Sequence, residues 1–304
     1  MKRISYSGHL TALSANLIFG LNMPVTKALL DRWMTPMGYM MSRVLFAAVF
    51  FWIASLFLKK ERVSGRDLWI IAAGGFFGFV LSQLLFAVSL EHTTPVHYSL
   101  ITAMNPIIVM LLAALLLKEP VSRMKIGGVA LGVIGAVLLI SQMDTAGAVG
   151  KGNLLGILLA VASNTAYAIY LIITRSVAQR YSTMTMMKWL FLFTALMLAP
   201  FGLSELPQQA VYREGTEVQA IAMIGYVLIA STALAYFLIP FALKRLRATT
   251  VSIYMNMQPI VASIAAICVG QDTLTWDKPV ALCLVMAGAV IVTLSPAKND
   301  VGQR

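Results

Sequence analysis

Long apolar runs, separated by short polar breaks, divide the chain into regular segments. Charged residues, proline and glycine mark ten such runs, and each is long enough to cross a bilayer as one helix of about 20 residues. The runs cover about 9–29, 37–58, 68–90, 95–117, 125–143, 152–174, 184–203, 219–243, 248–269 and 279–295. The one sizeable polar break is the segment Ser204–Val218. We therefore expect an all-α integral membrane protein with ten transmembrane helices and no soluble domain.

One module of this pattern occurs twice. The residues Met104–Ile107 reappear as Met257–Ile260, a shift of 153 positions. Residues 9–141 and 152–294 then form two units of five helices each. A unit that crosses the membrane an odd number of times leaves its copy upside down. We therefore expect two inverted five-helix repeats, the architecture of many alternating-access transporters.

The charge distribution indicates how the chain is oriented. Only 12% of the residues are charged, against about 25% in soluble proteins. If the N-terminus is inside, the loop cations that fall outside are Arg32, Lys151, Arg213 and Lys278, and the many others fall inside. The positive-inside rule then places both termini in the cytoplasm. The net charge of +11 is thus explained by topology, and we expect no nucleic-acid partner.

The sequence contains no motif that indicates a metal site, a cofactor site or an enzyme active site. Cys268 and Cys283 both lie in apolar runs and lack metal-ligand spacing. The histidine–glutamate motifs of membrane proteases and the nucleophile motif of hydrolases are missing from the sequence. We expect no metal, no cofactor and no enzyme activity.

Three cations, Lys27, Arg43 and Lys188, lie within or at the edge of the predicted spans. A charge in hydrocarbon costs several kcal/mol unless it is paired, hydrated or reaches the interface, so each is a functional candidate. Lys27 and Lys188 lie near enough to span ends to snorkel to the surface. Arg43 lies deeper, and would either bind an anionic substrate group or fix helix ends through carbonyl oxygens. No Asp or Glu falls in the middle of a span, so the buried charge is positive and favours a substrate with a carboxylate or another anionic group.

Uncharged polar residues concentrate in six of the ten spans, the first, third, fourth, sixth, eighth and ninth. They are Asn16, Asn22, Ser82, Gln83, Asn105, Asn164, Tyr167, Tyr170, Tyr236, Tyr254, Asn256 and Gln258. Amides in hydrocarbon need partners, and contacts between helices satisfy them as well as a substrate does. The bias predicts six helices around a polar pathway and four at the periphery.

Two prolines occupy equivalent positions in the two units. Pro106 and Pro259 each remove one backbone hydrogen bond from a helix and free the carbonyl four residues earlier. The freed carbonyls would line a site and the kinks would act as hinges, or the kinks would be static. We assign both prolines as hinge candidates.

These residues resemble the drug/metabolite transporter superfamily, specifically proteins with two tandem EamA domains. Phe19-Gly20-Leu21-Asn22 with Lys27 resembles the first-helix motif, with Phe19 in place of the usual Trp, and Arg43 is similar to the arginine of the second helix. The pairs Asn105-Pro106 and Gln258-Pro259 resemble the later parts of the two copies. The resemblance covers nearly the whole chain. It implies ten helices in two inverted repeats, cytoplasmic termini and a central cavity among helices 1, 3, 4, 6, 8 and 9.

The function expected from both lines is secondary transport in a bacterial inner membrane. The substrate would be a small polar metabolite, an amino acid or a derivative, moved outward by alternating access. The residues expected to bind it are Asn22, Arg43, Gln83, Tyr167, Tyr170, Asn256 and Gln258. The alternatives are a carrier of a lipid-linked or nucleotide-linked anionic group and a polytopic membrane enzyme. Partners would be the substrate and the lipid bilayer, with the chain acting as a monomer.

Coupling is the least defined part of this expectation. His92 and His97 lie near the outer ends of the third and fourth spans, where a histidine titrates near neutral pH. Both would equally suit an inert position at the membrane interface. The sequence leaves open whether transport is coupled to protons, to exchange or to nothing.

Overall fold

The structure, a computed structural model, describes residues 6–58, 60–116, 122–141, 152–213, 216–243, 254 and 257–294. Every regular element in these ranges is a helix. The α-helices of the first half are α1 (Tyr6–Arg32), α2 (Pro36–Leu56), α3 (Gly65–Gly75), α4 (Ser82–His92), α5 (Pro95–Ala103), α6 (Asn105–Leu116) and α7 (Arg123–Ser141). Those of the second half are α8 (Gly152–Arg180), α9 (Thr183–Gly202), α10 (Val218–Gly225), α11 (Ala235–Leu243), α13 (Met257–Cys268) and α14 (Asp277–Leu294).

Six of the described helical stretches are long and apolar enough to cross a membrane. α5 and α6 form a seventh if they are counted as one span, because they meet at a bend of 43° beside Met104. α7, α13 and α14 lie where the sequence predicts three more spans. The all-helical membrane architecture is therefore confirmed, whereas the total of ten spans and the side of the termini stay predictions.

Hydroxyl residues fix where several helices begin. The side chain of Thr35 accepts a hydrogen bond from the backbone N–H of Gly38, and Pro36 follows at the first helical position of α2. Thr94 and Pro95 start α5 in the same way. Because the cap satisfies a free N–H and proline needs none, these pairs stop one span and start the next within a few residues.

Two spans contain a wide helical turn that hydropathy alone does not predict. The π-helical segment η1 (Phe76–Leu81) joins α3 to α4, and η4 (Tyr226–Leu234) joins α10 to α11. The repeat shift of 153 carries residues 76–81 onto 229–234, inside η4. π segments occur often at functional sites, since the added residue re-aims the side chains that follow.

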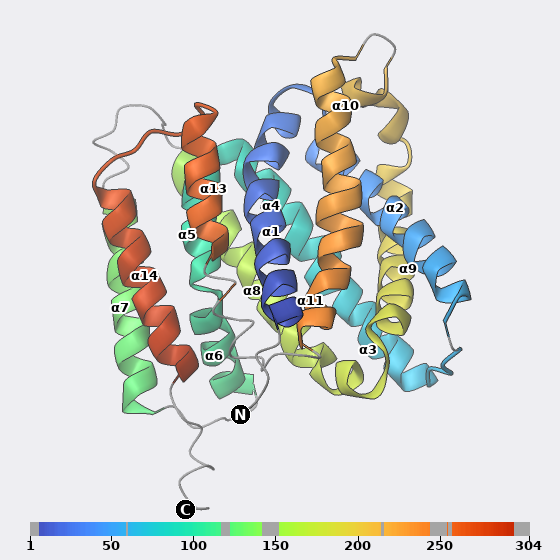
Figure 1. Cartoon of the computed structure of the whole chain (residues 1–304), viewed down its shortest axis with the longest axis horizontal. Helices are drawn as coiled ribbons and strands as arrows, with labels where there is room; N and C mark the ends of the chain where they lie inside the picture. The colour runs from blue at the N-terminus through green and yellow to red at the C-terminus, as the bar shows by residue number, and fades with distance from the viewer. Residues whose placement is uncertain are drawn as a thin grey trace, which may run out of the picture.

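The helices form one bundle in which α1 lies centrally, in contact with α11 and α13 (Figure 1). α7 and α14 pack against each other along one edge, and α2 packs against α9 on the opposite side (Figure 1). Small residues set the first of these contacts. A Cβ atom on Gly288 of α14 would lie 2.4 Å from the carbonyl oxygen of Gly128 in α7. Such an approach is open only to glycine, as the spacing Gly128-x3-Gly132 predicts.

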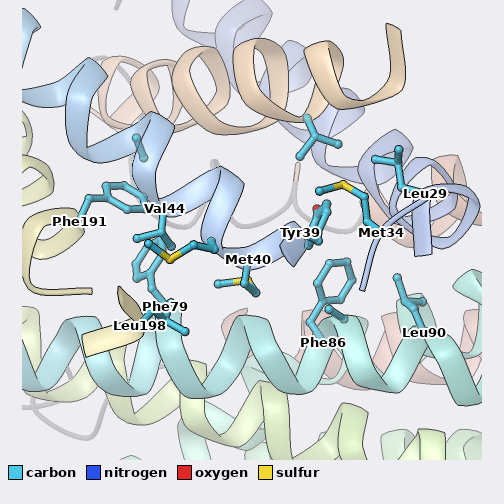
Figure 2. Close-up of a cluster of buried hydrophobic side chains, with 14 of the residues drawn as sticks. Leu29, Met34, Tyr39, Met40, Val44, Phe79, Phe86, Leu90, Phe191 and Leu198 are labelled. Carbon is cyan, nitrogen blue, oxygen red and sulfur yellow. The ribbon is translucent and has the colours of Figure 1, made fainter. Parts of the chain in front are cut away.

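The main hydrophobic core lies between α1, α2, α4 and α9. In Figure 2 the side chains of α2 lie close to those of its neighbours. Those of α2 are Tyr39, Met40 and Val44, and their neighbours include Leu29, Phe79, Phe86 and Phe191. The rings of Phe51 and Phe191 stack at 5.5 Å between centroids. This packing holds α2 inside the bundle and thereby buries Arg43, one turn after Tyr39 on the same helix.

Candidate functional site

Arg43 is the centre of a buried polar group. Its side chain is only 6% exposed, on the inner face of α2. Nη1 donates to Gln83 Oε1 at 2.9 Å, and Nε donates to Thr232 Oγ1 at 3.1 Å. Gln83 lies just after η1 and Thr232 lies within η4. One guanidinium therefore links the two π-containing spans.

Two further hydroxyl groups complete the surroundings of the guanidinium. Tyr39 lies with its hydroxyl 3.4 Å from Nη1 and its ring centroid 5.5 Å from Cζ, a cation–π arrangement. The Tyr39 hydroxyl also shares a hydrogen bond of 2.8 Å with Thr26 of α1. Tyr236 of α11 lies beside Arg43 as well. All of these partners are uncharged.

No carboxylate neutralises this cation in the part of the chain that the structure describes. The ion pairs found there join Lys27 to Asp31, Arg180 to Asp67, and Lys278 to Asp272. Uncharged partners do not neutralise a buried positive charge, so it can still attract an anion. A guanidinium binds carboxylate and phosphate oxygens most favourably. The site can therefore attract an anionic group without first breaking an ion pair.

Hydroxyl chemistry also holds the two π segments in place. The Thr232 hydroxyl donates to the carbonyl oxygen of Val227 at 2.8 Å, five residues back, while its oxygen accepts from Arg43. Next to η1, the carbonyl of Ser82 accepts a hydrogen bond of 2.7 Å from Ser163 of α8. Side chains thus satisfy backbone groups that an α-helical ladder would otherwise pair.

Aromatic rings line one side of the Arg43 group. Tyr236 contacts Phe19, Phe79 and Phe191, with ring centroids 5.7, 5.7 and 5.9 Å away. Phe79 also contacts Tyr170 at 5.7 Å. The rings come from α1, η1, α8, α9 and α11, so they join both halves of the chain. They offer an apolar and polarisable surface beside the cation.

Three buried oxygen acceptors in the helices lack a hydrogen-bond partner among the described residues. They are Oδ1 of Asn22 in α1, Oδ1 of Asn105 in α6 and Oγ of Ser231 in η4. Burying an oxygen without a hydrogen bond costs free energy, so a ligand that supplies the missing hydrogen bond would be favoured. Ser231 adjoins Thr232 in sequence, and Asn22 lies on the central helix.

The predicted binding residues divide into groups. Arg43 and Gln83 are bonded to each other, and Asn22 is buried with a free acceptor. The ring centroids of Tyr167 and Tyr170 lie 5.5 Å apart, and both tyrosines lie near enough to Tyr236 to interact with it electrostatically.

The remaining predictions fall elsewhere. Gln258 donates to Asn16 Oδ1 at 2.7 Å, which joins α13 to α1, so its amide serves a helix–helix contact. Asn256 lies outside the described residues. The bend of 43° lies two residues before Pro106, and Pro259 lies in the first turn of α13.

Sequence reasoning did not select Tyr39, Thr232 and Tyr236 as binding residues, although it named Tyr236 among the polar residues of the predicted pathway. A signal existed for one of them, because the repeat shift of 153 carries Gln83 onto Tyr236, and both lie beside Arg43. Tyr39 and Thr232 have no such signal. Their role depends on which helix faces pack together, and these helices lie far apart in the sequence.

The other two span cations lie apart from Arg43. Lys27 forms an ion pair of 3.0 Å with Asp31 near the end of α1. The Lys188 ammonium lies over the rings of Trp52 and Trp189, at 5.2 and 6.0 Å from their centroids. Neither shares a partner with Arg43 among the contacts described, so the three do not form a joint anion clamp.

Loops tie the two halves of the chain at both ends of the bundle. At one end Thr35 is bonded to Glu205 Oε2 and Gln209 Oε1, each at 2.7 Å. At the other end Asp67 binds Arg180 and Tyr181, each at 2.8 Å. Polar contacts therefore join the two halves of the chain at both ends of the bundle.

Comparison with known proteins gives a consistent family match. One family model, described as the EamA-like transporter family, matches residues 6–141 and again 154–294. An uncharacterized transporter of Archaeoglobus fulgidus is 25% identical over 261 residues, which cover 86% of this chain and 90% of the relative. The uncharacterized transporter YyaM of Bacillus subtilis is 26% identical, over 78% of this chain and 72% of the relative.

Two further similarities add detail. The multidrug resistance protein mmr of Mycobacterium bovis is 34% identical over 97 residues, which cover 31% of this chain and 90% of that protein. A solved crystal structure superposes with a TM-score of 0.62 at 19% identity, covering 95% of this chain and 98% of the other. That likeness supports the fold.

Proposed function

Because this chain belongs to the EamA-like transporter family, we propose that it exports a small polar metabolite, an amino acid or a derivative, by alternating access. The chain is a multi-pass membrane protein and a transporter rather than an enzyme. The substrate, the direction and the mechanism are our proposal. We place it in a bacterial inner membrane, where a metabolite exporter would act.

The observation that carries the substrate class is the charge of Arg43, which no carboxylate among the described residues neutralises. A guanidinium whose partners Gln83, Thr232 and Tyr39 are all neutral favours a ligand that brings a carboxylate or another anionic group. An incoming carboxylate would exchange with the Gln83 amide, which forms the weaker, neutral contact. The energy gained on binding then comes from a charge already desolvated in the fold.

The unpaired acceptors add a second requirement. Oδ1 of Asn22 needs a hydrogen-bond donor, the Ser231 hydroxyl can accept one, and an ammonium group supplies three. A zwitterion satisfies the cation and the acceptors together. The ring surface around Tyr236 suits an apolar or aromatic side chain on that zwitterion. These features favour an amino acid over a purely anionic metabolite.

The mechanism that we propose uses the two halves as inverted repeats. Pro106 and Pro259 would act as hinges, supported by the bend of 43° beside Met104. The π segments η1 and η4 would add a second pair of adjustable turns. Arg43 is hydrogen-bonded to Thr232 in η4 and to Gln83 just after η1. A substrate that binds Arg43 would therefore loosen the link between the two π segments. Binding would thereby favour exchange between inward and outward states.

The experiment that tests the function is transport in proteoliposomes. Vesicles with the purified chain are loaded with a pool of labelled amino acids, and efflux is measured with and without a pH gradient. We expect specific loss of one or a few amino acids above protein-free vesicles. If no amino acid moves in either condition, the amino-acid proposal fails, and a lipid-linked or nucleotide-linked anion becomes the next candidate. The separation of Lys188 from Arg43 argues against that alternative.

A further inference from the structure

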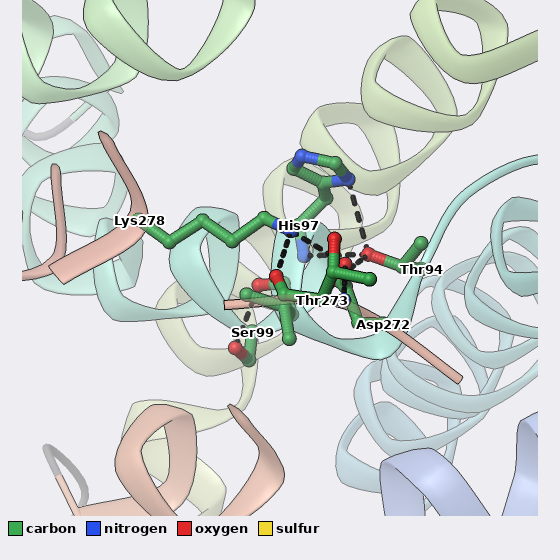
Figure 3. Close-up of polar contacts among 7 residues, drawn as sticks. Thr94, His97, Ser99, Asp272, Thr273 and Lys278 are labelled. Carbon is green, nitrogen blue, oxygen red and sulfur yellow. Dashed lines mark hydrogen bonds and ion pairs between the residues drawn. The ribbon is translucent and has the colours of Figure 1, made fainter. Parts of the chain in front are cut away.

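A second buried group of charged residues lies away from Arg43, at the end of the bundle where α5 begins. Figure 3 shows Thr94 and His97 of this corner facing Asp272, Thr273 and Lys278. The last three come from the segment between α13 and α14 and from the first turn of α14. We call these five residues the Thr94 cluster. It joins the first half of the chain to the second.

The hydrogen bonds of the cluster have a defined direction. Thr94 Oγ1 donates its one proton to Asp272 Oδ2 at 2.6 Å, because a carboxylate can only accept. The same oxygen lies 3.0 Å from His97 Nδ1, so that nitrogen must carry a proton and donate. Nε2 is then the ring nitrogen with a free lone pair. A further proton on His97 would go to Nε2.

The charges of the cluster balance while His97 is neutral. Lys278 Nζ donates to Asp272 Oδ1 at 2.5 Å and to the carbonyl of Thr273 at 2.6 Å, which neutralises that carboxylate. The neighbouring Asp277 lies in the first turn of α14, where the free N–H groups of the helix favour its negative charge. A proton on His97 would therefore add a positive charge beside Lys278, whose own charge Asp272 already neutralises.

His97 is the neutral group of the cluster whose protonation would upset this balance. The charged groups that influence it are Asp272, from the segment after α13, and Asp277 and Lys278 of α14. The other helices packed against α5 contribute none within the described part of the chain. Burial is the largest effect and, with Lys278, opposes a proton on the imidazole, whereas the two acids favour one. The imidazole is therefore neutral while the corner stays closed.

We propose that the Thr94 cluster is the coupling-cation site of the transporter, and that its cation is a proton taken up on Nε2 of His97. This proposal rests on the proposed transport function. The added charge competes with Lys278 for the carboxylate of Asp272, and it is better hydrated when α5 and the α13–α14 turn separate. Proton uptake thus weakens the contact between the two halves at this end. In the predicted orientation this end faces outside, so external protons would open the exporter outward.

The chain allows a direct test, since it contains three histidines, His9, His92 and His97. The full-length protein, labelled with ¹⁵N-histidine and placed in lipid nanodiscs, is titrated by NMR. Signals are assigned with single His→Gln variants. We expect the His97 signal to change from the neutral Nδ1–H form to the charged ring as the pH is lowered.

Charge variants give the decisive comparison. Lys278→Met removes the competing cation and should raise the midpoint of the His97 titration by about 1 pH unit, whereas Asp277→Asn should lower it by a similar amount. Lys278→Arg keeps the charge and should leave the midpoint in place, which controls for damage to the fold. A His97 signal that does not titrate, or midpoints indifferent to both charge changes, overturns the proposal. A spectral change on adding Na⁺ at constant pH also overturns it, because the cation would then be sodium.

Transport gives an independent readout. In the proteoliposome assay His97→Gln should abolish the effect of a pH gradient on efflux, and the matched variant His92→Gln should retain it. A gradient effect that survives His97→Gln contradicts the proton site. If the wild-type chain transports no amino acid, the proposed function fails, while the NMR titration still decides whether the site binds a proton.

Discussion

At the scale of single residues, the fold distinguishes two uses of buried polar side chains. Asn16 and Gln258 bond to each other across α1 and α13, and Asn16 also donates to the carbonyl of Ala12 at 2.7 Å. Arg43, by contrast, has neutral partners and a charge that no carboxylate neutralises among the described ion pairs. The first pair serves packing, and the second group is suited to a ligand.

The packing role of Gln258 gives a stability prediction. In Gln258→Leu the Oδ1 atom of Asn16 loses its donor at a buried helix contact, so we expect destabilisation of about 1 kcal/mol. The measurement is the thermal unfolding midpoint of purified protein in detergent. Gln208→Leu is the control, because the Gln208 side chain is exposed and bonds only within its own turn. Equal midpoints for the two variants would contradict the pairing.

Residue types alone located part of this site. The positions of Arg43 and Gln83 within apolar runs were sufficient to select them, since charges and amides there need a reason. The partners Tyr39 and Thr232 were not predictable, because a tyrosine and a threonine are ordinary in a span. Which face of η4 meets α2 depends on the packing of helices far apart in sequence.

At the scale of helices, the sequence predicted the spans well and their irregularities poorly. The predicted run 184–203 corresponds to α9 at Thr183–Gly202, and 37–58 corresponds to α2 at Pro36–Leu56. Hydropathy locates a span because the cost of burying polar residues is large. It does not detect η1 and η4, because one added residue per turn leaves the composition unchanged.

The contact of α7 with α14 gives a prediction at this scale. A methyl group on Gly288 would lie 2.4 Å from a backbone oxygen of Gly128, which cannot move aside, so Gly288→Ala should destabilise the protein by about 1–3 kcal/mol. Gly127→Ala is the matched control in α7, because a methyl group there meets no atom within 4 Å. Thermal unfolding of both variants is the measurement. A neutral Gly288→Ala would show that the helices are further apart than described.

The bend between α5 and α6 gives a second prediction at the scale of helices. Pro106→Ala restores a backbone donor and should stiffen the hinge, so we expect the transport rate to fall about tenfold while substrate affinity changes little. Pro200→Ala in α9 is the control, since that proline also lies inside a helix but away from the bend. Rates and apparent affinities come from the proteoliposome assay. A loss of affinity without a loss of rate would place Pro106 in binding rather than in motion.

At the scale of the whole molecule, repetition connects the sequence to the mechanism. The shift of 153 relates Met104 to Met257, Gln83 to Tyr236 and the π segment η1 to part of η4. The repeat was readable because its motif, Met-Asn-Pro-Ile and then Met-Gln-Pro-Ile, changes at one position only. Of the cluster around Thr94 and Asp272 only His97 was named from the sequence, since the acids lie at helix ends and only the fold brings them to the histidine.

The orientation of the molecule follows from its charge and is directly testable. Single cysteines are introduced as Gln208→Cys, in the segment after α9, and Arg62→Cys, between α2 and α3, after both native cysteines are replaced by serine. The positive-inside rule predicts that a membrane-impermeant maleimide labels Gln208→Cys in intact cells and Arg62→Cys only after permeabilisation. The reverse pattern would turn the molecule over and place the Thr94 cluster inside.

The role of Arg43 as the partner of an anionic substrate group is best tested by competition. For the amino acid identified in proteoliposomes, inhibition of transport by that amino acid is compared with inhibition by its carboxamide, in wild-type protein and in Arg43→Gln. We predict that wild-type protein prefers the carboxylate by about tenfold or more, equal to about 1.4 kcal/mol, and that the variant loses this preference. If Arg43→Gln transports more slowly but keeps the preference, Arg43 is a structural clamp and the substrate is held elsewhere.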